Sequence, residues 1–209
     1  MPSDQNANQP AHPLLEEMPN VPDLFHVYRY WYSHPAVKRV PGGWLYEGKT
    51  YPDYLTVGGA SHAIFRVALK YCIGVGVDIG AGLWPLPNAT PIDSERGEGK
   101  ENSIESYHDN SLDFIFSSHC LEHIEDWQGA LDSWLSKLKP AGKIFLYLPH
   151  ENCALWLPGS PFVGNGHKWI PTLSILEEDL RRRGCSIVDK DEGPDAMMSF
   201  FVCATKQSQ

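Results

Sequence analysis

Short apolar runs alternate with helix-periodic segments along most of the chain, and this alternation constrains the fold more than any other feature. The runs at 73–79, 112–118 and 143–149 have the composition of strands that are buried on both faces. Between and before them, 60–72 and 124–138 carry apolar residues at helical spacing. Such alternation predicts an α/β fold, a doubly wound and mostly parallel sheet covered by helices on both faces.

The end of the chain predicts a different pairing. After a helix that ends at Gly184, two further strands are expected at 186–192 and 199–206. They are close in sequence, so they can pair as an antiparallel hairpin without a crossover helix. A short strand at 89–93 completes the expected sheet elements. Asp126 is the expected N-cap of the helix within 124–138.

Composition limits the partners and the compartment. The chain of 209 residues has a formal net charge of −9, and its basic residues form no face suited to nucleic acid. Its 5 cysteines include no C-x-x-C pair, which favours a reducing compartment. Neither a signal peptide nor an apolar run of membrane-spanning length is evident, so we expect a soluble, cytoplasmic protein with no membrane partner. The oligomeric state is not predicted.

The sequence divides into three parts. Residues 1–20 are polar and proline-bearing, and we expect a disordered or flexible tail. Residues 21–59 are rich in Tyr, Trp, Gly and Pro, which suggests an aromatic cover segment. Residues 60–209 carry the alternating pattern and form the expected principal domain.

The stretch "GVDIGAGLWP" follows the first strand of that domain and is the expected ligand loop. Gly80 and Gly82 allow the backbone to approach a ligand closely. Pro85 stands where a dinucleotide fingerprint needs its third glycine, so a nicotinamide-dependent enzyme is disfavoured. Asp78 and Asp93 sit where carboxylates can meet a cationic group and ribose hydroxyls, and a ligand without phosphates fits better.

Four linked motifs, "VDIGAG", "PID", "DNSLDFIFSSHCLEHIEDW" and "LKPAGKIFLYLPH", occur in order. Together they resemble the class I S-adenosylmethionine-dependent methyltransferases of the small-molecule type, over about residues 60–205. The resemblance implies a seven-stranded Rossmann-like sheet with an antiparallel last strand and makes 60–209 the methyltransferase domain. It implies S-adenosylmethionine as the cofactor, with contacts from Asp78, Gly80, Ala81, Gly82, Asp93, Asn102, Ile104 and Ser118.

The chain departs from the family pattern at two places. The stretch from Gly82 to Asp93 is short and proline-bearing, so the usual helix there must be a turn or absent. Ala141 replaces the first glycine of the usual P-G-G turn.

His119, Glu122 and His123 spell H-x-x-E-H, which is also the signature of an inverted zinc-protease site. Such a site needs a third ligand, and the downstream Glu177 and Glu178 belong to a separate helix face. We therefore expect no metal, and expect Glu122 and His123 to pair with backbone or surface groups. His119 follows a strand that ends at the cleft, so we predict that it is the general base or orients the acceptor.

The remaining candidates concern the acceptor. His150, His167 and Trp169 lie in a long connection that we expect to bind substrate, and Tyr54 or Tyr51 is expected to contribute to a lid. The predicted function is methyl transfer from S-adenosylmethionine to a small-molecule or sugar-like acceptor. A non-catalytic binding or scaffold protein with the same fold is the alternative. A DNA amino-methyltransferase is disfavoured, because "SSHC" stands where an N-P-P-Y motif would be needed.

Overall fold

The computed structural model describes residues 36–41, 43–52, 55, 60–82, 84–93 and 103–208. A six-stranded sheet in the order β5-β4-β6-β7-β9-β8 forms its centre, and every neighbouring pair outside those made by β9 is parallel. Its strands are β4 (Gly76–Ile79), β5 (Thr90–Ile92), β6 (Leu112–Ser118), β7 (Leu138–Pro149), β8 (Cys185–Asp191) and β9 (Ser199–Lys206).

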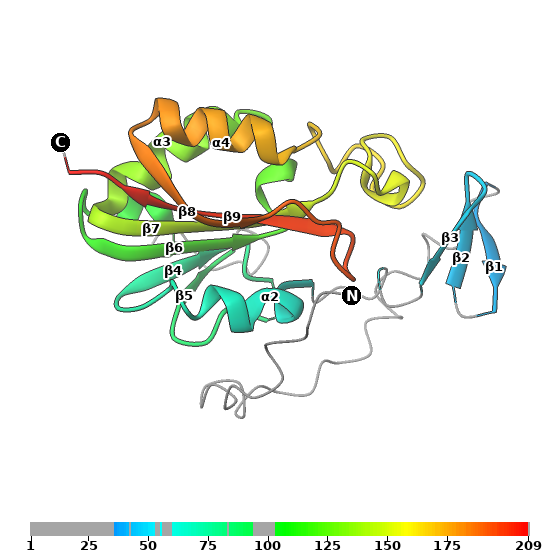
Figure 1. Ribbon diagram of the computed structural model, residues 1–209, viewed down its shortest axis with the longest axis horizontal. Coiled ribbons are helices and arrows are strands. Elements are labelled where there is room, and N and C mark those ends of the chain that lie inside the picture. The colour runs from blue at the N-terminus through cyan, green and yellow to red at the C-terminus, as the bar shows by residue number, and fades with distance from the viewer. Residues whose placement is uncertain are drawn as a thin grey trace, which may run out of the picture.

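Helices cover both faces of this sheet (Figure 1). The helix α2 (Ala60–Ala68) packs on one face, and α3 (Trp127–Lys137) and α4 (Leu173–Arg182) pack on the other. The 3-10 turns are η6 (Ile104–Ser106), η7 (Leu121–His123) and η8 (Ala154–Trp156).

The two faces hold two separate cores because side chains alternate along each strand. In β6, Phe114 and Phe116 point toward α2, and Ile115 between them points toward α3 and α4. In β7, Phe145 and Tyr147 lie on the α2 side. A strand buried on both faces favours apolar residues at successive positions, which explains the apolar runs at 114–116 and 144–148.

The structure confirms the doubly wound α/β fold, and β8 and β9 form the expected antiparallel hairpin. Asp126 caps α3 by accepting a hydrogen bond from the Gly129 N–H, as predicted. The strand count differs, because the described residues supply six strands to the sheet and not seven. Residues 94–102, which follow β5, lie outside the described ranges.

A second, three-stranded antiparallel sheet lies beyond one end of the large sheet (Figure 1). It consists of β1 (Lys38–Val40), β2 (Gly43–Tyr46) and β3 (Lys49–Pro52). Trp44 and Tyr51 are buried in a small core against Leu155 and Phe162 of the long connection after β7. Tyr51 is therefore buried in this small core. Residues 21–35 of the expected cover segment lie outside the described residues, as does the expected tail at 1–20.

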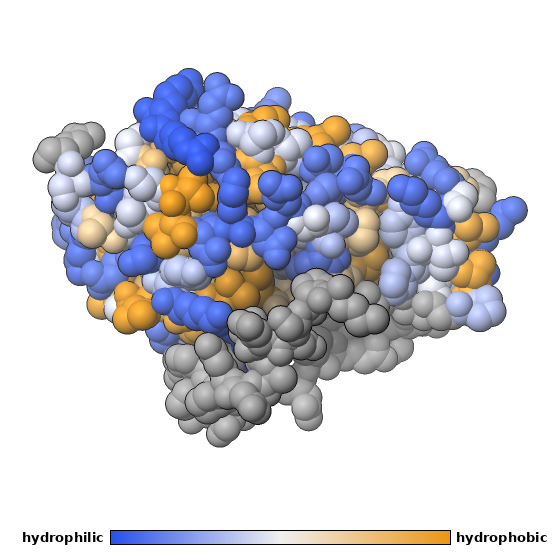
Figure 2. Space-filling view, in the orientation of Figure 1, coloured by the Kyte–Doolittle hydropathy of each residue, from blue (hydrophilic) through white to orange (hydrophobic). Residues whose placement is uncertain are grey.

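Hydrophilic side chains dominate the face of the molecule that Figure 2 shows, with smaller hydrophobic areas between them. Among the described residues, no helix has the length and apolar character needed to cross a membrane.

The substitution of Ala141 for glycine has a backbone consequence that we can test. Ala141 has φ 63°, a left-handed conformation that costs an L-residue about 1–2 kcal/mol. Glycine removes that cost, while its added freedom in the unfolded chain costs about 0.4–1 kcal/mol. We therefore expect Ala141→Gly to raise the free energy of unfolding by about 0.5–1 kcal/mol in urea denaturation.

Ala130→Gly is the matched control, because Ala130 lies inside α3. There the same substitution should lower the free energy of unfolding by about 1 kcal/mol. A loss of stability in both variants would contradict the left-handed strain at Ala141.

Candidate functional site

The carboxyl ends of three parallel strands meet at one edge of the sheet. Ile79 at the end of β4 pairs with Ile92 of β5 on one side and with Ser117 of β6 on the other. The residues that follow these strands, Gly80 and Asp93 among them, are therefore neighbours. This edge is where doubly wound sheets bind their ligands.

The glycine loop after β4 requires both of its glycines, for different reasons. Gly80 has φ +77°, and a Cβ there would lie 2.4 Å from the Cβ of Cys120. Gly82 has φ +53°, and a Cβ there would meet no atom of a described residue within 4 Å. The first glycine thus permits contact with the segment after β6, and no described residue crowds the second.

Asp93 holds this loop in place. Its Oδ2 accepts a hydrogen bond of 2.7 Å from the Gly82 N–H, and the Gly80 N–H donates to the carbonyl of Ile92 at 2.8 Å. The loop is therefore tied to the end of β5 by both its glycines.

Asp78 is buried and has a structural partner. Its Oδ2 accepts a hydrogen bond of 2.7 Å from the Leu86 N–H, which folds the proline-bearing connection back against β4. No helix forms at 80–82 or 84–89, as Pro85 and Pro87 predicted. The expected contact of Asp78 with the cofactor stays a prediction.

The other expected cofactor residues differ in what the structure shows of them. Ser118 ends β6 and is buried, and Ala81 lies between the two glycines. Ile104 begins η6 and is buried in the core on the α3 side. Asn102 lies outside the described residues.

His119 follows β6 with a left-handed backbone, φ 49°. Its Nε2 lies 2.8 Å from Ser199 Oγ at the start of β9, and its Nδ1 lies 3.6 Å from Glu122 Oε1. Burial lowers the pKa of His119 to about 3, so the ring is neutral near neutral pH. Both nitrogens face groups of the protein itself, and the role of His119 as a general base stays a prediction.

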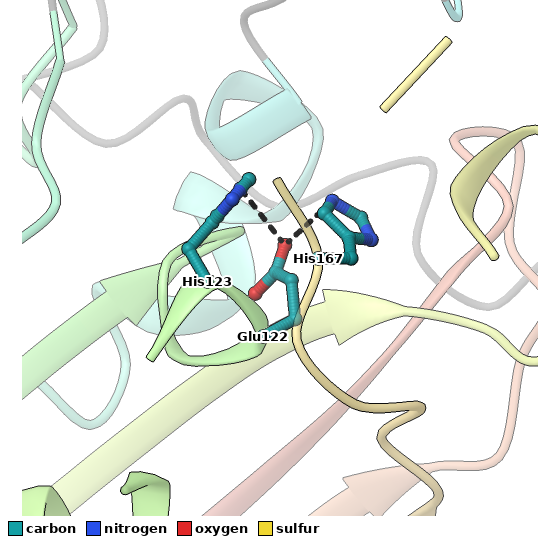
Figure 3. A group of neighbouring side chains, drawn as sticks. All are labelled: Glu122, His123 and His167. Carbon is teal, nitrogen blue, oxygen red and sulfur yellow. Dashed lines mark ion pairs between the residues drawn. The ribbon is translucent and has the colours of Figure 1, made fainter. Parts of the chain in front are cut away.

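Glu122 is the least expected member of the site. It is 0% exposed, and neither of its carboxylate oxygens makes a hydrogen bond with a described residue. Desolvation raises the pKa of this carboxyl to about 8. Besides His119, the Nε2 atoms of His123 and His167 each lie 3.9 Å from Oε1, and Figure 3 shows both rings directed at that oxygen.

The segment 166–169 brings His167 to this place by binding η7 along its whole length. The Gly166 carbonyl meets His123 Nδ1 at 3.1 Å, and the Lys168 N–H donates to the Glu122 carbonyl at 2.8 Å. The Trp169 Nε1–H donates to the Leu121 carbonyl at 3.0 Å.

Two residues predicted to bind substrate, His167 and Trp169, instead contact other parts of the protein in this structure. Trp169 also stacks on Trp127, with ring centroids 4.3 Å apart, so its indole is a packing element of this region. Burial lowers the pKa of His167 to about 4, and its Nδ1 lies 2.6 Å from the Trp156 carbonyl. Substrate binding by either residue stays a prediction, and Tyr54 lies outside the described residues.

His150 lies in a different place. Together with Thr172, Glu177 and Lys190 it lines an open pocket between the ends of β7 and β8 and the start of α4, whose lining includes neither His119 nor His167. Of the three histidines predicted around the acceptor, this pocket of described residues therefore includes only His150.

The sequence signal for the His–Glu group was the H-x-x-E-H pattern itself. Glu122 was expected to pair with backbone or surface groups, and its side chain instead lies buried among three imidazoles. For His123 that expectation holds, because its Nδ1 contacts the Gly166 carbonyl.

A doubly wound sheet with a glycine loop and a carboxylate at its ligand edge, and without the phosphate fingerprint, defines a class of proteins that bind nucleoside-type cofactors. The family model described as a methyltransferase domain matches residues 40–190. The chain therefore belongs to this family, within the class I S-adenosylmethionine-dependent methyltransferases, and S-adenosylmethionine is its cofactor.

Solved structures show the same fold at low sequence identity. An S-adenosylmethionine-dependent methyltransferase from Mesorhizobium loti has a TM-score of 0.52 at 17% identity, covering 71% of this chain and 99% of that one. The 1,6-didemethyltoxoflavin-N1-methyltransferase from Burkholderia thailandensis, with bound 1,6-didemethyltoxoflavin and S-adenosylhomocysteine, has a TM-score of 0.52 at 17% identity, covering 75% and 82%.

A third similar structure is the [4+2]-cyclase SpnF, with a TM-score of 0.53 at 16% identity, covering 90% of this chain and 94% of that one. Comparison with curated proteins finds no significant match.

The two loop glycines provide a matched pair of variants. Gly80→Ala adds a Cβ against Cys120 and keeps a left-handed backbone, whereas Gly82→Ala meets only the backbone cost of about 1–2 kcal/mol. We expect Gly80→Ala to lower the melting temperature several degrees more than Gly82→Ala in thermal unfolding. Equal shifts would mean that the contact between Gly80 and Cys120 does not constrain the loop.

Proposed function

We propose that this methyltransferase transfers the methyl group of S-adenosylmethionine to a small-molecule acceptor at the carboxyl edge of β4, β5 and β6. The observation that carries the proposal is the glycine loop tied to Asp93, in which no described residue lies within 4 Å of a Cβ placed at Gly82. The bound cofactor supplies a methyl group already activated on a sulfonium, so the chain's own residues position both reactants and exclude water.

The residues at this edge fit the cofactor. The backbone of Gly80, Ala81 and Gly82 is able to approach a ligand closely because it carries almost no side-chain volume. Asp93 follows β5, where a carboxylate accepts hydrogen bonds from ribose hydroxyls. Its Oδ2 also accepts the Gly82 N–H, so cofactor contact and loop geometry depend on one side chain.

The proposal of a small acceptor, including a sugar-like one, rests on charge and on similarity. A net charge of −9 disfavours a nucleic-acid acceptor, because phosphates would be repelled. The Burkholderia structure named above holds a small heterocyclic molecule with S-adenosylhomocysteine in the same fold. The acidic composition and the reduced cysteines are consistent with a cytoplasmic enzyme that has no membrane partner, which we include in the proposal.

The segment at 36–52 is proposed as part of a cover. Its small sheet packs on Leu155 and Phe162, in the same connection that carries His167 to the ligand edge. A movement of this sheet would therefore reach the loop that borders the acceptor.

A non-catalytic or differently catalytic protein is the second candidate. One protein of this fold, SpnF, is named as a [4+2]-cyclase, so the fold alone does not fix methyl transfer as the outcome. Incubating the purified chain with S-adenosylmethionine and a panel of small hydroxyl, amine and thiol compounds separates the two. Acceptor-dependent formation of S-adenosylhomocysteine supports methyl transfer, and cofactor binding without turnover across the panel supports the alternative.

Asp93 allows a graded test of cofactor binding. Asp93→Ala removes both the ribose acceptor and the Gly82 partner, and we expect calorimetry to show S-adenosylhomocysteine affinity weakened by about 1–3 kcal/mol. Asp93→Asn keeps an oxygen for the Gly82 N–H but loses the charge. Its affinity for S-adenosylhomocysteine should lie between that of Asp93→Ala and that of the parent protein.

Glu178→Ala is the control, since Glu178 is an exposed carboxylate on α4. It should bind the cofactor as the parent protein does. Unchanged affinity in Asp93→Ala would remove Asp93 from the site.

A further inference from the structure

The buried carboxylate of Glu122 is surrounded by the ring nitrogens of three histidines. Taking a carboxylate out of water is unfavourable unless hydrogen bonds or an opposite charge replace the lost hydration. Glu122 is 0% exposed and neither oxygen has a hydrogen bond from a described residue. The identity of the group that compensates this carboxylate depends on where the histidines carry their hydrogens.

The outer contacts of His123 and His167 determine their tautomers. His123 Nδ1 lies 3.1 Å from the Gly166 carbonyl, and His167 Nδ1 lies 2.6 Å from the Trp156 carbonyl. A carbonyl oxygen only accepts hydrogen bonds, so each Nδ1 carries a hydrogen and donates it. In the neutral rings, the Nε2 atoms facing Glu122 Oε1 therefore present lone pairs.

The same reasoning applies to His119 through a hydroxyl. The single hydrogen of the Ser199 hydroxyl has two acceptors within reach, the Met197 carbonyl at 3.0 Å and His119 Nε2 at 2.8 Å. When the carbonyl accepts it, His119 carries its own hydrogen on Nε2 and presents the lone pair of Nδ1 to Glu122 Oε1, 3.6 Å away.

In that arrangement the lone pairs of the three imidazoles are directed at Glu122 Oε1. A proton shared between a nitrogen and this oxygen does not account for the distances between them. The nitrogens lie 3.6, 3.9 and 3.9 Å from Oε1, beyond the about 3.2 Å limit of a hydrogen bond. A metal ion about 2.0–2.2 Å from each ligand spaces neighbouring ligand atoms by about 3–3.5 Å. The ligand atoms of Glu122, His123 and His167 all lie within 4.8 Å of one another, so small side-chain movements would close them on an ion.

We propose that Glu122, His123 and His167, with His119 as the fourth ligand, bind one divalent first-row transition-metal ion. Imidazole-rich sites suit zinc, iron, nickel or copper, whereas magnesium and calcium prefer oxygen ligands. The hydrogen bonds on the outer ring nitrogens are those that hold ligand histidines in metal sites. Figure 3 shows Glu122 and His123 on η7 and His167 on a separate segment facing them.

This site differs from the one that the H-x-x-E-H pattern suggests. Its histidines are carried by a strand end, a 3-10 turn and a loop, not by one long helix. The sequence argued against a metal because no third ligand was evident after the motif, and the structure supplies His167. Cys120, between two of the ligands, contacts Gly80, so the ion would lie beside the cofactor loop. The site does not depend on the proposed methyl transfer.

Metal analysis of the untagged 209-residue chain tests the site directly. Elemental analysis after purification, and titration of the metal-free protein with cobalt followed by its visible absorption, should each give about one ion per chain. His123→Ala is the main variant, because its side chain is 47% exposed and its loss leaves no large void. It should weaken cobalt binding by at least about tenfold. A loss of that size already follows when only the hydrogen-bond partner of a ligand histidine is removed. His108→Ala, at an exposed histidine away from the cluster, should bind as the parent protein does.

Thermal unfolding with and without a chelator distinguishes the loss of a metal ligand from misfolding of a variant. Chelation should lower the melting temperature of the parent protein and leave that of Glu122→Gln unchanged. Without metal, Glu122→Gln should be at least as stable as the parent protein, since it replaces a buried carboxyl by a neutral isostere. Substoichiometric cobalt, parent-like affinity in His123→Ala, or an equal chelator effect in Glu122→Gln would each overturn the proposal.

Discussion

The attachment of residues 166–169 to η7 is the interaction on which the arrangement of the candidate site depends. Three hydrogen bonds join the two segments, and two of them use backbone carbonyls of η7 itself. A 3-10 turn of three residues has little stability of its own, because it closes few internal hydrogen bonds. The long connection after β7 therefore supplies the support that fixes Glu122 and His123, and it also delivers His167.

The main elements were predictable from the sequence because their causes are local or periodic. Apolar runs buried on both faces predicted β6 and β7, and the closeness of the last two strands predicted their hairpin. Pro85 and Pro87 predicted the absence of a helix after the glycine loop. The number of strands was less accessible, since it rested on family resemblance and not on a run of residues.

The site was less predictable because its contacts join segments far apart in sequence. The Asp78 carboxylate was assigned to the cofactor, and its bond to the Leu86 N–H depends on how the proline-bearing connection folds back. Likewise, no periodicity places His167 against Glu122, because only the folded connection does so. Gly80 was expected to let the backbone approach a ligand. Its close contact with Cys120 was not predicted, because that contact requires β4 and β6 to be neighbours.

The position of β9 has a consequence for how the molecule is made. It follows every other described strand along the chain, yet it lies between β7 and β8, and within the described sheet β8 pairs with β9 alone. While a ribosome is still synthesising the chain, β7 has an open edge and β8 has no partner. Ser199, the first residue of β9, also orients the ring of His119. The nascent chain therefore cannot form the contact that orients His119 until β9 has emerged, which keeps this part of the candidate site incomplete throughout earlier synthesis.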